Sequence, residues 1–205
     1  MKKIVYILNI VALAFISFTA CEDYLDRPGL DQFEDDEFWT KEGNVRLYAQ
    51  RAYTAYFTGY GSGYTWGNEY SSSSIWTQNT ATSGNGWTFE WVRWANVLID
   101  RVNKMENLTE EEKNHWIGIG RFFRAMEYSD LAKLFGDIPY FDKIVDYKDL
   151  ETSYKKRDPL PYVAKKIMED FQFAADYVRE NDGIQQVNRS IVLGFMSRSM
   201  LYFGT

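Results

Sequence analysis

The chain is poor in the residues that most often carry chemistry, with a single cysteine, Cys21, and a single histidine, His115. One cysteine excludes an internal disulfide framework, so the stability of the fold has to come from packing. The two residues together provide no metal-ligand cluster and no convincing Ser/His or Cys/His nucleophile. These absences argue against an enzyme, a bound metal and any other cofactor.

Positive charge is also scarce, because the chain has 23 Lys and Arg but 29 Asp and Glu, which gives a formal net charge of -6. No run of Lys and Arg of the kind that neutralises phosphates is present, so we expect no nucleic acid partner. Paired carboxylates can hydrolyse glycosides. The acidic runs at 35–37 and 110–112, however, are typical of solvated helix starts, where acids favour the helix dipole. We therefore expect no catalytic residues.

The main apolar run spans residues 4–18, directly after two lysines. It is shorter than the about 20 residues that a membrane-spanning helix needs, and it is typical of a secretory signal. Small residues then lead into Cys21, as in bacterial lipoprotein signals, where the cysteine is acylated and becomes the first mature residue. The sequence predicts a signal peptide over residues 1–20 and lipidation of Cys21, with palmitate among the acyl chains. An ordinary signal peptide beside a stray thiol is the alternative.

Acidic residues follow the predicted lipidation site at Glu22, Asp23 and Asp26. We assign residues 21–36 to a lipid-anchored acidic linker. In some Gram-negative groups, acids in this position resemble a signal for export to the outer face of the outer membrane. The alternative is a solvated linker that does not indicate on which face of the outer membrane the protein lies.

Apolar residues at three- and four-residue spacing predict five helices and no strand. They fall near residues 40–57, 91–105, 109–135, 159–180 and 188–203. The fold class is therefore all-α, with helical hairpins of tetratricopeptide-like type, although no strict period of about 34 residues is visible.

Local signals set the expected helix ends. Thr109 and Glu112 form a capping box, and Gly136 stops the third helix. Asp158, directly before Pro159, is predicted to be the N-cap of the fourth helix. We expect Asp137 to cap local N–H groups. Arg121 and Arg124 are expected to form scaffold ion pairs with Asp130.

Between the first two helices, residues 59–86 are rich in Gly, Ser, Thr and Asn and lack any period, which predicts a long irregular loop. Its aromatic side chains can stack on the apolar face of a sugar ring while neighbouring amides bond to its hydroxyl groups. Packing of these aromatics onto the helices, or against a partner, is the alternative. The candidate ligand-binding residues are Trp66, Asn68, Tyr70, Trp76, Gln78, Asn79 and Trp87.

Four segments, in order, resemble the N-terminal part of the SusD/RagB-like outer-membrane nutrient-binding lipoproteins. They read CEDYLDRP, DEFWTKEGNVRLYAQRAY, GRFFRAMEYSDLAKLFGDIPYF and IMEDFQFAADYV. The third is the most specific, because its Phe-Arg-Ala, Phe-Gly-Asp and proline elements all fall where the family has them. The resemblance covers essentially the whole chain.

This resemblance implies a tetratricopeptide-like scaffold, tethered by lipid to the extracellular side of the outer membrane, that sits as a lid on a SusC-like TonB-dependent transporter. It also implies an oligosaccharide or polysaccharide ligand, with peptides bound in one branch. Members are usually more than twice this length, so we expect residues 37–205 to be the N-terminal part of the helical domain, incomplete at its C-terminus. A structural lid that binds no ligand, or a truncated remnant, is the alternative.

Overall fold

The structure is a computed structural model that describes residues 38–57, 86–146 and 148–204. The chain divides into a unit of residues 1–38 and a unit of residues 39–205, and the helices named here belong to the second. Within the described ranges all regular elements are helices, apart from one isolated bridge between Ile138 and Asp158, which confirms the all-α class. The helices are α4 (Glu42–Tyr56), α5 (Glu90–Lys104), α6 (Glu110–Phe135), α7 (Leu150–Ser153), α8 (Leu160–Tyr177) and α9 (Arg189–Phe203).

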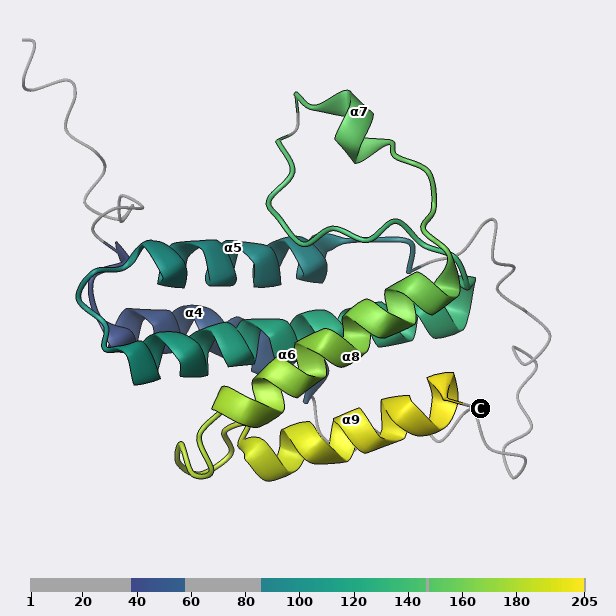
Figure 1. The fold of residues 1–205 in the computed structure, drawn as a ribbon. Helices are drawn as coiled ribbons and strands as arrows, with labels where there is room; N and C mark the ends of the chain where they lie inside the picture. The colour runs from purple at the N-terminus through teal and green to yellow at the C-terminus, as the bar shows by residue number, and fades with distance from the viewer. Residues whose placement is uncertain (1–37, 58–85, 147, 205) are drawn as a thin grey trace, which may run out of the picture. The chain divides into compact units, whose positions relative to one another are not determined.

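Helix α6 is the centre of this arrangement and packs against α5 and α8, while α9 packs against α8 (Figure 1). Its apolar residues lie around most of its circumference, as a helix with neighbours on several sides requires. Trp116, Phe122, Phe123 and Tyr128 on α6 are all almost completely buried. Replacing Phe122 by Ala would remove core contacts and cost about 3–5 kcal/mol.

The predicted ends of α6 and α9 are confirmed. The Thr109 hydroxyl accepts from the Glu112 backbone N–H (3.3 Å), and the Glu112 carboxylate accepts from the Thr109 backbone N–H (2.8 Å). Gly136 then ends the helix with a left-handed φ of 70°, which glycine adopts without strain. At α9, the Asn188 side chain accepts from the backbone N–H of Ile191 (3.0 Å).

The start of α8 differs from the prediction, because its N-cap is Pro159 rather than Asp158. The Asp158 carboxylate instead accepts from the backbone N–H of Tyr140 (2.7 Å), far away in sequence. Asp137 accepts from the backbone N–H of Leu160 (2.8 Å), so it caps a helix that begins 23 positions later. The two aspartates thus join the turn after α6 to the start of α8, a pairing that local sequence rules cannot detect.

The short helix α7 was not predicted. It is only one turn long, and Asp149 caps it, because the Asp149 side chain accepts from the backbone N–H of Thr152 (3.0 Å). The predicted signal peptide, Cys21 and the linker lie outside the described residues, as does most of the predicted loop. Among the helices that the structure does describe, none is both long and apolar enough to cross a membrane.

Candidate ligand-binding site

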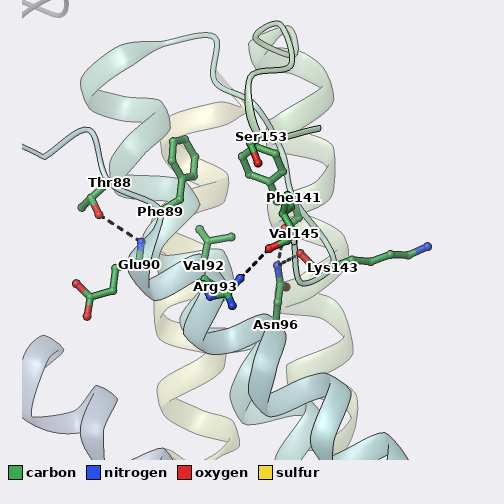
Figure 2. A pocket seen from close by; sticks show the side chains of 10 residues that line it. All are labelled: Thr88, Phe89, Glu90, Val92, Arg93, Asn96, Phe141, Lys143, Val145 and Ser153. Carbon is green, nitrogen blue, oxygen red and sulfur yellow. Dashed lines mark hydrogen bonds between the residues drawn. The ribbon is translucent and has the colours of Figure 1, made fainter. Parts of the chain in front are cut away.

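A pocket of about 450 Å³ lies between the start of α5 and the segment that connects α6 to α8 (Figure 2). We call it the α5 pocket. Phe89, Val92 and Phe141 provide its apolar wall, whereas Thr88 and Glu90 carry polar groups at its edge. Its lining residues are Thr88, Phe89, Glu90, Val92, Arg93, Asn96, Phe141, Lys143, Val145 and Ser153.

Two side chains of α5 hold the far wall of this pocket in place. The Arg93 guanidinium donates to the backbone carbonyl of Val145 (2.8 Å), and the Asn96 amide donates to those of Phe141 and Lys143 (3.0 Å each), as Figure 2 shows. Lys143 itself points away from Asn96 in this view. Because these bonds satisfy backbone carbonyls of an irregular segment, they fix the position of the wall.

A buried ion pair lies directly behind Asn96. Arg124 on α6 donates from Nε and Nη2 to the two carboxylate oxygens of Asp170 on α8 (2.7 Å each), and from Nη1 to Asn96 Oδ1 (2.7 Å). Burial alone would lower the pKa of Arg124, but the bidentate bond to Asp170 outweighs it and raises the pKa above its ordinary value. The guanidinium therefore stays charged, and the pocket wall rests on a rigid network of three helices.

The predicted pairing of Arg121 and Arg124 with Asp130 is wrong. Asp130 is exposed and pairs with Lys133 (3.2 Å), while Arg121 lies 3.8 Å from Asp170. Residues six or nine positions apart on a helix do not share a face. Both arginines do form ion pairs within the scaffold, but the carboxylate that pairs with them belongs to Asp170 on α8.

Trp87 is the only predicted ligand residue that lies within the described ranges. Its side chain is 40% exposed, so it is available on one side. On the other sides it packs edge to face against Phe135 and Phe89, with ring centroids 4.9 and 5.5 Å away, and the Arg157 guanidinium lies 4.7 Å over its ring. Trp87 thus packs on the scaffold and presents aromatic surface beside the α5 pocket, and its contact with a ligand stays a prediction.

The remaining candidates, Trp66, Asn68, Tyr70, Trp76, Gln78 and Asn79, lie outside the described residues and stay predictions. The structure adds Arg93 and Asn96, which the sequence analysis missed. Asn96 is 3% exposed and sits on the apolar stripe of α5, between Ala95 and Leu98. A polar residue on a buried stripe was the signal that could have identified it.

The surroundings of the single histidine indicate a structural role. His115 is completely buried, and its Nδ1 accepts from the backbone N–H of Arg179 (3.2 Å). Burial lowers its pKa to about 4, so the ring is neutral at pH 7. Within the described part of the chain, no three His, Cys, Asp or Glu side chains gather in a way that would hold a metal ion.

A family model described as "Starch-binding associating with outer membrane" matches residues 30–201. The chain therefore belongs to the SusD-like family, whose members associate with the outer membrane at the cell surface. This confirms the resemblance that the four sequence segments carry. No curated protein matches the chain.

Solved structures show the same fold. A SusD-like protein from Bacteroides fragilis matches with a TM-score of 0.63 and 20% identity, over 86% of this chain and 38% of its own. A SusD-like carbohydrate-binding protein from the same species gives 0.57 and 17%, over 80% and 38%. Surface glycan-binding protein A from Bacteroides fluxus gives 0.50 and 22%, over 60% and 27%. The chain thus spans 38% of the length of the first of these relatives.

Proposed function

We propose that this chain is the glycan-binding subunit of a TonB-dependent nutrient uptake complex, which captures an oligosaccharide at the cell surface and delivers it without catalysis. The observation that carries the proposal is the family match over residues 30–201. The structural relatives support the ligand class, since two of them are described as carbohydrate- or glycan-binding.

The surface around Trp87 has the chemistry that such a ligand needs. An exposed indole can stack on the apolar face of a pyranose ring, and it loses little conformational entropy because Phe135 and Phe89 already hold it. The Thr88 hydroxyl and the Glu90 carboxylate, at the edge of the adjoining α5 pocket, supply polar atoms for ring hydroxyls. In the proposed site, residues 59–85 contribute Trp66 and Trp76 as further stacking surfaces.

The proposal places the protein on the outer face of the outer membrane, tethered through acyl chains on Cys21, with a SusC-like transporter as partner. One acyl chain anchors a protein only marginally, so lipoprotein processing that adds several chains is part of the proposal. The acidic linker over residues 21–36 would separate the anchor from the helical domain.

The ligand site is tested with the full chain purified in detergent and run through gels that contain single polysaccharides. Replacing Trp66, Trp76 and Trp87 together by Ala should weaken retention on the cognate polysaccharide by about tenfold or more, because stacking contacts worth roughly 0.5–1.5 kcal/mol each are lost. Tyr177→Ala, which removes an exposed aromatic from α8, is the matched control and should migrate like the wild type. Unchanged retention of the triple variant would refute this placement of the site.

The uptake role is tested by purifying the tagged chain from native outer membranes and identifying the proteins that accompany it. A TonB-dependent barrel in comparable amount is the expected result, and Cys21→Ser should release the protein from the membrane. Absence of a barrel would overturn the transporter partnership.

A lid that binds the transporter but no ligand is the second candidate. It is favoured by the exposed apolar side chains of Leu193 and Met200 on α9, which suit a protein partner. A barrel that co-purifies with a chain unretained by any polysaccharide or peptide would establish it. Retention by peptides alone would instead identify a peptide-binding member of the family.

A further inference from the structure

A second pocket, of about 650 Å³, lies between the C-terminal half of α4 and the connection from α8 to α9. We call it the amide pocket, because four of its lining side chains are carboxamides. Its principal side chains are Gln50, Tyr53, Phe57, Gln185, Gln186 and Asn188. None of these side chains is among the candidate ligand-binding residues predicted from the sequence, and none has a role in the proposed function.

The lining of the amide pocket is uncharged. None of the described residues that line it is Asp, Glu, Lys, Arg or His. The α5 pocket differs, since Glu90, Arg93 and Lys143 line it. A neutral lining offers no partner to a carboxylate, sulfate or ammonium group, and burying an unpaired charge there would be costly. The pocket therefore favours ligands without charge.

The backbone around the pocket is held in place. The Tyr53 hydroxyl accepts from the buried backbone N–H of Val187 (3.0 Å), and Gln50 Nε2 donates to Gln186 Oε1 (3.1 Å). At the start of the connection, the Asp182 carboxylate accepts from Arg46 (2.6 and 2.9 Å) and from Arg179 (2.9 Å). These contacts tie the connection to α4, so little ordering is left for a ligand to impose.

Polar atoms remain available inside this fixed frame. Gln50 Oε1 and Gln186 Nε2 make no hydrogen bond to any other residue in the described part of the chain. Asn188 uses Oδ1 to cap α9, which leaves its amide nitrogen as a donor. The Phe57 side chain is 40% exposed beside them. Donors and acceptors around an aromatic surface match a ring that has hydroxyl groups at its edge and C–H groups on its face.

We propose that the amide pocket binds one or two residues of an uncharged oligosaccharide, as a second contact separate from the Trp87 surface. Its volume lies within the about 300–1,000 Å³ typical of small-molecule sites. The inference rests on the proposed function for its ligand class and sharpens it, because it selects neutral glycans over acidic glycans and peptide termini.

The two contacts are far apart along α6. Phe57 packs against Phe123, whereas Trp87 packs against Phe135, and 12 residues of helix correspond to about 18 Å. One sugar ring cannot reach both. Two separate contacts would raise the apparent affinity for a polymer above that for a short fragment.

The test measures binding of uncharged hexaoses to heptaoses (malto-, xylo-, manno- and laminari-oligosaccharides) and of oligogalacturonate, by titration calorimetry on the full chain in detergent. The decisive variant is Gln50→Leu with Gln186→Leu, which replaces both partners of one hydrogen bond by apolar side chains of similar size and so leaves no orphaned group. Phe57→Ala is the second variant. Gln172→Leu, the same replacement at an exposed position on α8, is the matched control.

We expect the double variant to weaken binding of the preferred neutral oligosaccharide about tenfold and Phe57→Ala about fivefold, with far-UV circular dichroism unchanged. The control should bind like the wild type. Wild-type affinity in both pocket variants would overturn the amide pocket and leave the proposed function standing. Binding of oligogalacturonate alone, unaffected by the variants, would also overturn the pocket and leave a glycan-binding protein. Binding of no glycan would refute the proposed function together with this inference.

Discussion

Two arginine-centred networks support the helices, and they differ chiefly in exposure. In the first, Arg124 joins Asp170 and Asn96, and the side chains of the ion pair are 5% and 3% exposed. In the second, at the start of α6, Arg179 donates to Glu42, Glu111 and Asp182, and Glu111 is 63% exposed. Both use charge-assisted bonds of 2.7–2.9 Å. The two networks therefore have similar hydrogen-bond geometry, but solvent screens the charges of the second network more than those of the first.

This difference in exposure predicts which network loses more folding stability when one of its residues is replaced. A buried ion pair contributes little net stability compared with apolar residues, but removing one partner leaves an unpaired buried charge. An exposed ion pair regains water when it breaks, so its loss costs little. The network behind the α5 pocket should therefore be intolerant of single replacements, and the Arg179 network should tolerate loss of its outermost member.

The largest effect is expected at the buried pair. Arg124→Met leaves the Asp170 carboxylate without its bidentate partner and with only the partly exposed Arg121, 3.8 Å away, as a counter-charge, and it should lower the free energy of unfolding by about 3 kcal/mol. The measurement is urea denaturation of the full chain followed by far-UV circular dichroism. The same change should loosen the wall of the α5 pocket, because Asn96 loses the donor that orients it.

A second replacement distinguishes charge from packing. Arg124→Met combined with Asp170→Leu removes both charges and should recover a large part of the lost stability. Recovery will be incomplete, since Asn96 and the Asp142 carbonyl still lack the Arg124 donor. A double variant no more stable than Arg124→Met would contradict the assignment of the cost to an unpaired charge.

The sequence predicts the helices well because their signals are local. Helix α6 combines a capping box, an apolar circumference and a terminal glycine within one continuous segment, and its observed bounds follow these signals. Helix α7 has no apolar stripe because it is a single turn, which explains why periodicity did not reveal it. The start of α8 was misassigned because its cap, Asp137, comes from another segment.

The sites are less predictable than the helices because they depend on contacts between distant segments. Trp87 was identified from residue type, yet its packing against Phe135 required the fold. The pairing of Gln50 with Gln186 joins residues 136 positions apart, and nothing in either local sequence indicates it. Arg124 was assigned to the correct kind of interaction with the wrong acid for the same reason.

An intermediate effect is expected from pH. Burial lowers the pKa of His115 to about 4 from an ordinary value of 6.5, so the folded state keeps the ring neutral. Below pH 6.5 the unfolded chain takes up a proton that the folded chain does not, so stability is complete above pH 6.5 and is lost as pH falls toward 4. Between pH 7 and pH 5 the free energy of unfolding should fall by roughly 2 kcal/mol.

His115 is the only histidine, so no other side chain has an ordinary pKa within this window. Burial raises the pKa of the Glu127 carboxyl, and this group acts with the opposite sign because the folded chain takes up its proton first. In the Arg179 network, the pKa values of Glu111 and Asp182 are lowered, so those carboxylates contribute to pH dependence only at more acidic values. His115→Gln should therefore flatten the dependence between pH 6.5 and 5 while leaving the acid limb below it. A wild-type slope in this variant would show that another group titrates in that window.

The smallest effect is expected at Glu111, although its geometry is as good as that of Asp170. It accepts two bonds from Arg179 (2.8 and 2.9 Å), and these bonds lower the pKa of the carboxyl. Because the side chain is mostly in water, Glu111→Gln should cost no more than about 1 kcal/mol, and added salt should reduce even that difference. Denaturation of both proteins at low and high ionic strength measures it. A loss as large as that of Arg124→Met, insensitive to salt, would mean that exposure does not separate the two networks, and that geometry alone determines what an arginine contributes in this fold.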